Sequence, residues 1–181
     1  MTWHIFIGCN ITNRMAEELF DGRLLVHTQQ NGLVLRPLCS DDYEKGHCVV
    51  LSQLTVVGDV TKDEWLAMFR KMKSRDGAYF IVVVENVQEK KIVGSGTLFI
   101  EDKIIRNCGR CGHIEDIVVD SKCRGKNVGL WIIETLRSLA QRVGCYKLIL
   151  DCSEKNVPFY EKCGFARKEV QMVQYFQKSK L

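Results

Sequence analysis

A short glycine-containing segment between a strand pattern and a helix pattern constrains the fold of this chain more than any other feature. The segment spans residues 123–130 and reads CRGKNVGL. The β-branched run 112–120 precedes it and predicts a strand, and the amphipathic stretch 128–143 that follows predicts a helix. The segment is therefore the loop of a strand–loop–helix unit, in which glycines let the backbone approach a bound group closely.

The composition of this loop suits a diphosphate. Free N–H groups in the first turn of a helix, reinforced by the helix dipole, attract anions, and Arg124 and Lys126 add positive charge. The three-glycine Rossmann fingerprint and the Gly-Lys-Ser/Thr ending of a P-loop are both absent. From these eight residues alone, a diphosphate site and an ordinary strand-to-helix turn remain equally good interpretations.

Patterns elsewhere predict one α/β domain with a mixed central β-sheet flanked by helices. A chain of 181 residues suits a single core. Thr61 and Glu64 form a capping-box pattern that predicts the start of a helix, and Ser40, Asp41 and Asp42 supply residues typical of another helix start. Residues 79–85 and 91–100 predict a hairpin, and the later strand–loop–helix–strand order predicts a crossover. The remaining expected elements are a first strand at 33–38, a buried strand at 146–151, a short helix at 156–163 and a final strand at 169–176.

The domain is expected to span residues 32–176. Residues 1–31 are interpreted as an N-terminal extension with a short helix around 13–20, and residues 177–181 as a C-terminal tail. The tail ends in Ser179, Lys180 and Leu181, the tripeptide that a peroxisomal import receptor reads at a free carboxyl terminus. We therefore expect import into peroxisomes or glycosomes, and otherwise a cytoplasmic location.

Strand, RGxxxG loop and helix in this order resemble the pyrophosphate-binding motif of the Gcn5-related N-acetyltransferases, although Asn127 stands where glycine is commoner. Further stretches, GLVLRPL and SQLT within 32–55, HIEDIVV at 113–119 and LDCSEKNVPFYEKCGF at 150–165, are similar to the glucosamine 6-phosphate N-acetyltransferase family. The resemblance covers about residues 32–176. It implies the Gcn5-related fold, acetyl-CoA as co-substrate, an amino sugar phosphate as acceptor in UDP-N-acetylglucosamine biosynthesis, no metal, and a homodimer.

The resemblance also implies roles for individual residues. Tyr160 would donate to the leaving thiolate, Glu115 and Asp116 would edge the acetyl site and relay the amine's proton, and Asp151 would hold the sugar. These types fit the chemistry, because an amine attacks only when deprotonated and a thiolate leaves more easily beside a proton donor. Coenzyme A would contact Ile117, Val118, Val119, Arg124, Gly125, Lys126, Asn127, Val128, Gly129, Leu130, Asn156, Tyr160 and Lys162.

The expected contacts of the sugar phosphate depart from the family at one position. The resemblance implies substrate contacts from Thr55, Lys103, Ile104, Ile105 and Arg106, besides the three carboxylates. Where family members carry an arginine near the last strand, this chain reads Gln-Tyr-Phe at 174–176. A basic residue elsewhere, Lys103, Arg106 or Arg167, would have to compensate.

Other classes of function are less well supported. A net charge of +4 without a dense basic stripe does not favour nucleic-acid binding, and no apolar run approaches the length of a membrane helix. Nine cysteines are interpreted as reduced thiols; Cys108 and Cys111 with nearby His113 suggest a metal or redox motif, but a hairpin turn carrying two thiols is the simpler interpretation. Transfer to another small amine or a protein lysine, and a catalytically silent CoA-binding module, remain as alternatives.

Overall fold

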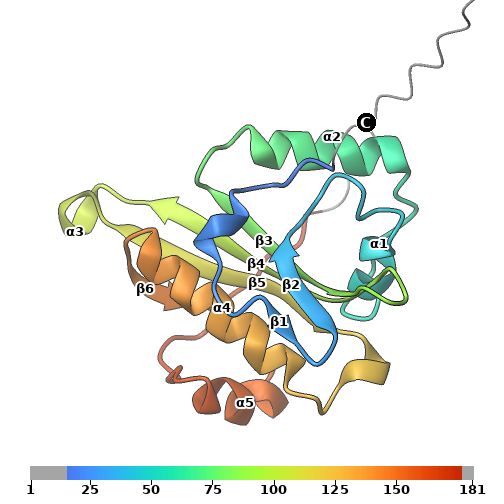
Figure 1. Cartoon of the computed structure of the whole chain (residues 1–181). Helices are drawn as coiled ribbons and strands as arrows, with labels where there is room; N and C mark the ends of the chain where they lie inside the picture. Colours follow the sequence, from blue (N-terminus) through green and yellow to red (C-terminus); the bar gives the residue numbers. More distant parts are fainter. Residues whose placement is uncertain (1–15, 177–181) are drawn as a thin grey trace, which may run out of the picture.

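A six-stranded sheet organises residues 16–176, the part of the chain that this computed structural model describes. The strands lie in sequence order, and neighbours are antiparallel except for β5 and β6, which are parallel. The predicted hairpin and crossover are confirmed, and the sheet is mixed as expected (Figure 1). The strands are β1 (Gln29–Gln30), β2 (Leu33–Pro37), β3 (Tyr79–Asn86), β4 (Lys91–Asp102), β5 (Arg110–Val119) and β6 (Cys145–Ile149).

Two longer helices and several short ones accompany the sheet. Helix α2 starts where predicted, because the Thr61 hydroxyl accepts from the Glu64 N–H and the Glu64 carboxylate accepts from the Thr61 N–H. Among residues 16–176 no helix is long and apolar enough to span a bilayer. The helices are η1 (Gly22–Leu24), α1 (His47–Leu51), α2 (Lys62–Lys73), α3 (Ile105–Cys108), η2 (Ser121–Cys123), α4 (Val128–Arg142), η3 (Glu154–Asn156) and α5 (Val157–Lys162).

The helix expected to start at residues 40–42 begins only at His47, so that prediction is wrong in position. The side chain of Asp42 is used elsewhere. Its carboxylate accepts from the Cys39 N–H at 2.7 Å and from the Arg36 guanidinium at 2.7 and 2.8 Å, which holds residues 40–46 in turns.

Alternate residues of β3 face two separate apolar clusters. Phe80, Val82 and Val84 pack on the side of α4, whereas Ile81 and Val83 pack on the side of α1 and α2. Figure 1 shows α2 and α4 on opposite sides of the sheet. A strand buried on both faces explains why residues 79–85 are apolar without alternation.

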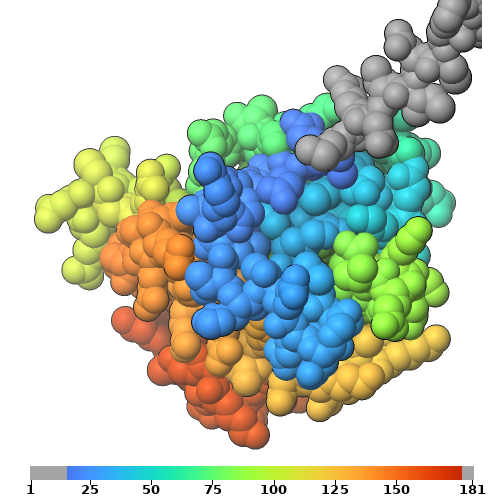
Figure 2. All heavy atoms as spheres, in the orientation of Figure 1, coloured from blue at the N-terminus to red at the C-terminus, as the bar shows by residue number. Residues whose placement is uncertain are grey.

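Residues 16–31 pack against the domain instead of lying apart from it. Leu19 and Leu25 are buried, and the backbones of Glu18 and Cys39 pair in an isolated antiparallel β-bridge. The Trp131 indole N–H donates to the His27 carbonyl at 2.9 Å. Figure 2 shows this segment, in blue, lying on the rest of the molecule. The helix predicted around 13–20 is absent over residues 16–20, and its first residues lie outside the described range.

The carboxyl-terminal segment departs most from expectation. Residues 165–176 form no strand, so the predicted strand at 169–176 is wrong, and Val170, Met172 and Tyr175 are almost fully exposed. The strand predicted at 146–151 exists as β6, but it is exposed or half-buried along its length instead of buried. Among residues 16–176, β6 is the last strand of the sheet, and its outer edge has no partner strand.

The buried His47 predicts how stability depends on pH. Trp65 donates its indole N–H to His47 Nδ1 at 3.3 Å, and His47 Nε2 lies 3.1 Å from the Ser95 hydroxyl, so the neutral imidazole uses both nitrogens. Burial lowers the pKa of His47 to about 4. The unfolded chain, with a histidine pKa near 6.5, therefore binds more protons between about pH 6.5 and 4.

We expect the free energy of unfolding to be highest above about pH 6.5 and to fall toward pH 4 by up to about 3 kcal/mol from this group. Urea unfolding at a series of pH values measures it. A His47→Gln variant should show a shallower decline over that window. An equal decline in both proteins would contradict the assignment.

Candidate active site

The two parallel strands β5 and β6 separate halfway along β5. Their pairing ends at His113 and Ile149, whereas β5 continues to Val119. Just beyond this point β5 bulges: Gly96 of β4 alone stands opposite Asp116 and Ile117, and Asp116 has a left-handed φ of 53°. Bulges of this kind redirect side chains and often lie beside active sites.

The end of β5 leads into the predicted phosphate loop. Residues 117–119, expected to contact coenzyme A, form the last part of β5, and η2 and the loop follow. Gly125 has a φ of +78°, and a side chain there would meet nothing within 4 Å, so the backbone faces open space. The first hydrogen bond of α4 runs from the Trp131 N–H to the Asn127 carbonyl. The N–H groups of Val128, Gly129 and Leu130 therefore remain free to bind an anion.

Asn127 occupies its unusual position without cost to this cradle. It is the N-cap of α4 with a φ of 59°, in the left-handed region that asparagine tolerates better than most residues. Arg124, which donates from Nε to the Val119 carbonyl at 3.2 Å, and Lys126 are both exposed beside the loop. The loop thus combines free N–H groups, a helix N-terminus and two cations, and it fits a diphosphate.

Three of the predicted catalytic residues form an acidic group at the opening between β5 and β6. Partial burial raises the pKa of the Glu115 carboxyl, and the neighbouring carboxylates of Asp116 and Asp151 raise it further. Asp151 lies two residues after β6 and accepts from the Gln171 side-chain amide at 2.7 Å. The structure therefore brings these carboxylates close enough to interact, as expected from their neighbouring strands.

Tyr160 lies in α5 and is half-buried. Its ring packs edge-on against Phe159 and Phe165, at centroid distances of 5.0 and 6.2 Å. Burial raises the pKa of the phenol, with a smaller contribution from the Cys152 and Cys163 thiols, which keeps the hydroxyl protonated at neutral pH. Asn156 and Lys162, expected to contact coenzyme A, lie at the two ends of the same short helix and are exposed.

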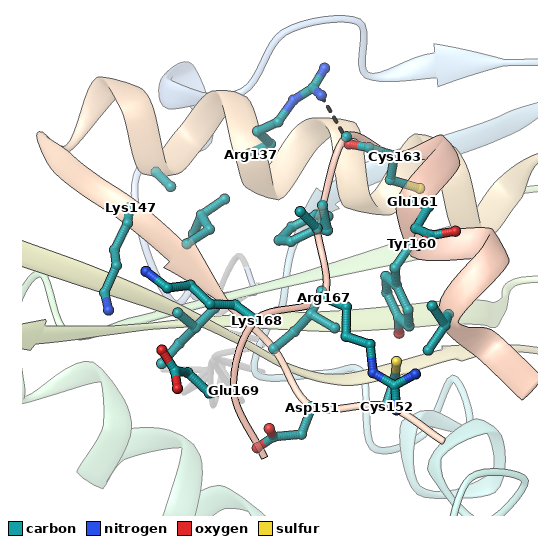
Figure 3. Close-up of a pocket in the computed structure, with 18 of the residues that line it drawn as sticks. Arg137, Lys147, Asp151, Cys152, Tyr160, Glu161, Cys163, Arg167, Lys168 and Glu169 are labelled. Atoms are coloured by element: carbon teal, nitrogen blue, oxygen red, sulfur yellow. Dashed lines mark hydrogen bonds between the residues drawn. The ribbon is translucent and has the colours of Figure 1, made fainter. Parts of the chain in front are cut away.

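A cavity of about 840 Å³ is lined by Asp151 and Tyr160 together with Cys152, Arg167 and Gln171. Figure 3 shows Tyr160 with its hydroxyl directed toward the side where Cys152 and Arg167 lie. Arg167 forms an exposed ion pair with Glu154. Gln171 was missed because it falls inside the predicted final strand, and Cys152 because a thiol next to Asp151 carries no pattern of its own.

The predicted sugar contacts outside the acidic group do not gather in the single chain. Thr55 lies in an exposed turn after α1, and residues 103–106 form the tip of the β4–β5 hairpin, which projects from the body (Figure 2). None of them lines the cavity that contains Asp151 and Tyr160. Lys103 instead pairs with Glu101.

A mixed sheet whose parallel strands separate beside free N–H groups of a helix N-terminus offers a site for an anionic cofactor, and comparisons identify the family. Residues 41–165 match the acetyltransferase (GNAT) family, so the chain belongs to that family. GNAT acetyltransferases use acetyl-CoA as the acetyl donor.

Relatives at 40% identity or more include glucosamine 6-phosphate N-acetyltransferases. The chain is 52% identical over 145 residues to glucosamine 6-phosphate N-acetyltransferase 1 of Dictyostelium discoideum, covering 80% of this chain and 92% of that protein. It is 46% identical over 142 residues to the glucosamine 6-phosphate N-acetyltransferase of Arabidopsis thaliana, covering 78% and 95%. The crystal structure of the Arabidopsis enzyme aligns with a TM-score of 0.79 at 44% identity, over 81% of this chain and all of that one. The expected fold and enzyme class are confirmed.

Replacement of Gly125 tests the phosphate loop. A Gly125→Val substitution should abolish acetyl-CoA binding measured by calorimetry, because valine strains the left-handed backbone and blocks the approach of the diphosphate. Gly77→Val is the matched control, since Gly77 has a φ of +73° and equally open surroundings outside the motif. Both proteins should keep their circular dichroism spectra. Unchanged affinity in folded Gly125→Val protein would remove the loop from the donor site.

Proposed function

We propose that this protein transfers the acetyl group of acetyl-CoA to the amine of D-glucosamine 6-phosphate, giving N-acetyl-D-glucosamine 6-phosphate and CoA. The single observation that carries the proposal is the joint presence of the open Gly125 loop at the α4 N-terminus and the carboxylates at the separation of β5 and β6. The loop supplies a site for the donor, and the carboxylates supply acceptors for the proton of an attacking amine. The relatives with this activity at 46% and 52% identity support the choice of acceptor.

The donor is held by the backbone in this proposal. Free N–H groups of the first turn of α4 bind the diphosphate, and Arg124 and Lys126 add attraction from the loop. The unpaired side of β5 beyond His113 leaves peptide groups available to the rest of the coenzyme. When bound, acetyl-CoA supplies the thioester that the amine attacks.

The carboxylates handle the acceptor amine. An ammonium must lose a proton before its nitrogen can attack, and Glu115 and Asp116 at the opening accept it in this proposal. Asp151 holds the sugar through its ammonium or a hydroxyl, because its carboxylate lines the cavity and keeps acceptor capacity beyond its bond with Gln171.

Arg167 is the strongest of the three candidates for the sugar phosphate. Of Lys103, Arg106 and Arg167, only Arg167 lines the cavity with Asp151 and Tyr160. Its partner Glu154 is exposed, and an exposed ion pair is readily exchanged for a dianionic phosphate that accepts charge-assisted hydrogen bonds.

Assembly and location complete the proposal. The protein forms a homodimer in this proposal, which covers the exposed edge of β6 and the exposed side chains of Val170, Met172 and Tyr175. Sedimentation velocity tests this, because a dimer has twice the chain mass of 20.8 kDa. Import through the terminal Ser-Lys-Leu stays a prediction, since residues 179–181 lie outside the described range. Fluorescent fusions with and without Leu181 test it.

Acceptor specificity tests the proposed reaction. Thiol release from acetyl-CoA should be fastest with glucosamine 6-phosphate in a panel that also contains glucosamine, glucose 6-phosphate, other small amines and lysine peptides. Glucosamine tests the phosphate and glucose 6-phosphate tests the amine. A faster small amine or peptide would favour a different acetyltransferase, and no thiol release with any acceptor would favour a CoA-binding module.

Tyr160→Phe separates a proton donor from a packing residue. The change keeps nearly all apolar volume, so packing should be preserved. If the hydroxyl serves the leaving thiolate, kcat should fall about 100- to 10,000-fold, while Tm and acetyl-CoA affinity change little. Phe159→Leu is a packing control for the same aromatic cluster. Near-normal kcat in folded Tyr160→Phe enzyme, with chemistry limiting the rate, would assign Tyr160 to packing alone.

A further inference from the structure

A group of metal-ligand side chains lies on the β4–β5 hairpin, outside the phosphate loop and next to β6, whose Lys147 and Ile149 line the cavity. Glu101 of β4 pairs directly with Cys111 of β5, and His113 follows two residues later on the same face of the strand. One ligand atom from each of the three lies within 4.8 Å of the other two. The proposed reaction gives Cys111 and His113 no role.

We propose that Glu101, Cys111 and His113 bind a divalent cation of the Zn²⁺ class. Thiolate, imidazole and carboxylate are the ligands that Zn²⁺ takes in proteins, and three protein ligands leave a fourth position for water. On binding, the Cys111 sulfur donates an electron pair to the ion and its proton leaves to solvent.

The geometry requires little movement. Bond lengths of about 2.0 to 2.3 Å place tetrahedral zinc ligands about 3.3 to 3.6 Å apart. His113 Nε2 and Glu101 Oε2 are now 2.9 Å apart in a hydrogen bond, and the sulfur lies within 4.8 Å of both. The ion would replace the proton between nitrogen and oxygen, and the sulfur would have to move closer to the other two ligands by at most about 1.5 Å.

The surroundings also suit a metal centre. Lys103 contacts the other carboxylate oxygen of Glu101, Oε1, and can keep that contact while Oε2 binds the ion. Ligating carboxylates are usually fixed by such outer contacts. The Phe99 ring lies 5.8 Å from the His113 ring and restricts its orientation. Cys111 is fully buried, whereas Glu101 and His113 keep partly exposed side chains, so an ion would enter from their side.

The other cysteine-containing group of this kind among the described residues lacks these properties. In the group of Cys39, Asp41 and Asp42, the Asp42 carboxylate already accepts from the Arg36 guanidinium through both oxygens and from the Cys39 N–H. A cation there would have to displace Arg36 from a buried ion pair. This second group therefore serves as an internal comparison.

Co²⁺ is the probe, because sulfur ligation gives a charge-transfer band in the near ultraviolet and tetrahedral coordination gives strong visible bands. The reduced full-length protein should bind one equivalent of Co²⁺ with both signatures, and Zn²⁺ should displace it. Cys111→Ser should lose the charge-transfer band, and Glu101→Gln and His113→Ala should weaken binding at least about 10-fold, since even outer contacts of metal sites change affinity by about 10- to 100-fold.

Cys39→Ser and Cys145→Ser are the matched controls and should leave both bands unchanged. Glu101→Gln keeps the test valid if the buried Cys111→Ser protein fails to fold. Absence of the charge-transfer band in wild-type protein, its persistence in folded Cys111→Ser, unchanged affinity in Glu101→Gln, or its loss in Cys39→Ser would each overturn the proposal. The outcome is independent of the acetyl-transfer assay, because none of these residues is assigned to that reaction.

Discussion

The close packing of α4 on β4 is the constraint on which the candidate active site depends. A Cβ at Gly96 would lie 2.6 Å from Ile132 of α4 and 2.7 Å from Ile117 of β5, closer than atoms can approach. Gly96 is also the residue opposite the bulge at Asp116 and Ile117. The absence of a side chain at Gly96 thus lets α4 lie against the sheet and leaves room for the Ile117 side chain. The N-terminus of α4 and the end of β5 are held in one arrangement as a result.

Patterns that depend on local contacts were predictable from the sequence. Three features are of this kind: the Thr61–Glu64 capping box, the β3–β4 hairpin and the apolar face of α4. The residues that form each of them lie within a few positions of one another or on one neighbouring strand. The strand expected at 169–176 is different. Its pattern of apolar and polar residues suits a strand, but the sequence does not specify the strand with which it would pair. In the single chain the segment stays unpaired and the edge of β6 stays open.

The candidate site divides in the same way. The prediction of an anion-binding loop rested on local features, the spacing of Gly125 and Gly129 and the helix that follows them. The left-handed backbone at Asp116 was not predictable, since it arises from a two-against-one mismatch between β4 and β5 that the residue pattern of neither strand shows. Leu19 and Leu25 were likewise missed in the core, because they belong to two short apolar groups, 19–20 and 24–26, that together show no helix or strand period.

Of the three candidate cations for the sugar phosphate, Lys103 and Arg167 are each already paired with a carboxylate, so charge alone does not choose between these two. Both pairs are exposed enough for water to screen them, and neither would prevent capture of a phosphate. Position decides. Arg167 lines the cavity with Asp151 and Tyr160, so a sugar held there presents its amine and its phosphate to residues of one site. Lys103 lies beside the Glu101, Cys111 and His113 group, where its positive charge fixes the carboxylate. The two cations are thus divided between the proposed sugar site and the proposed group of metal ligands.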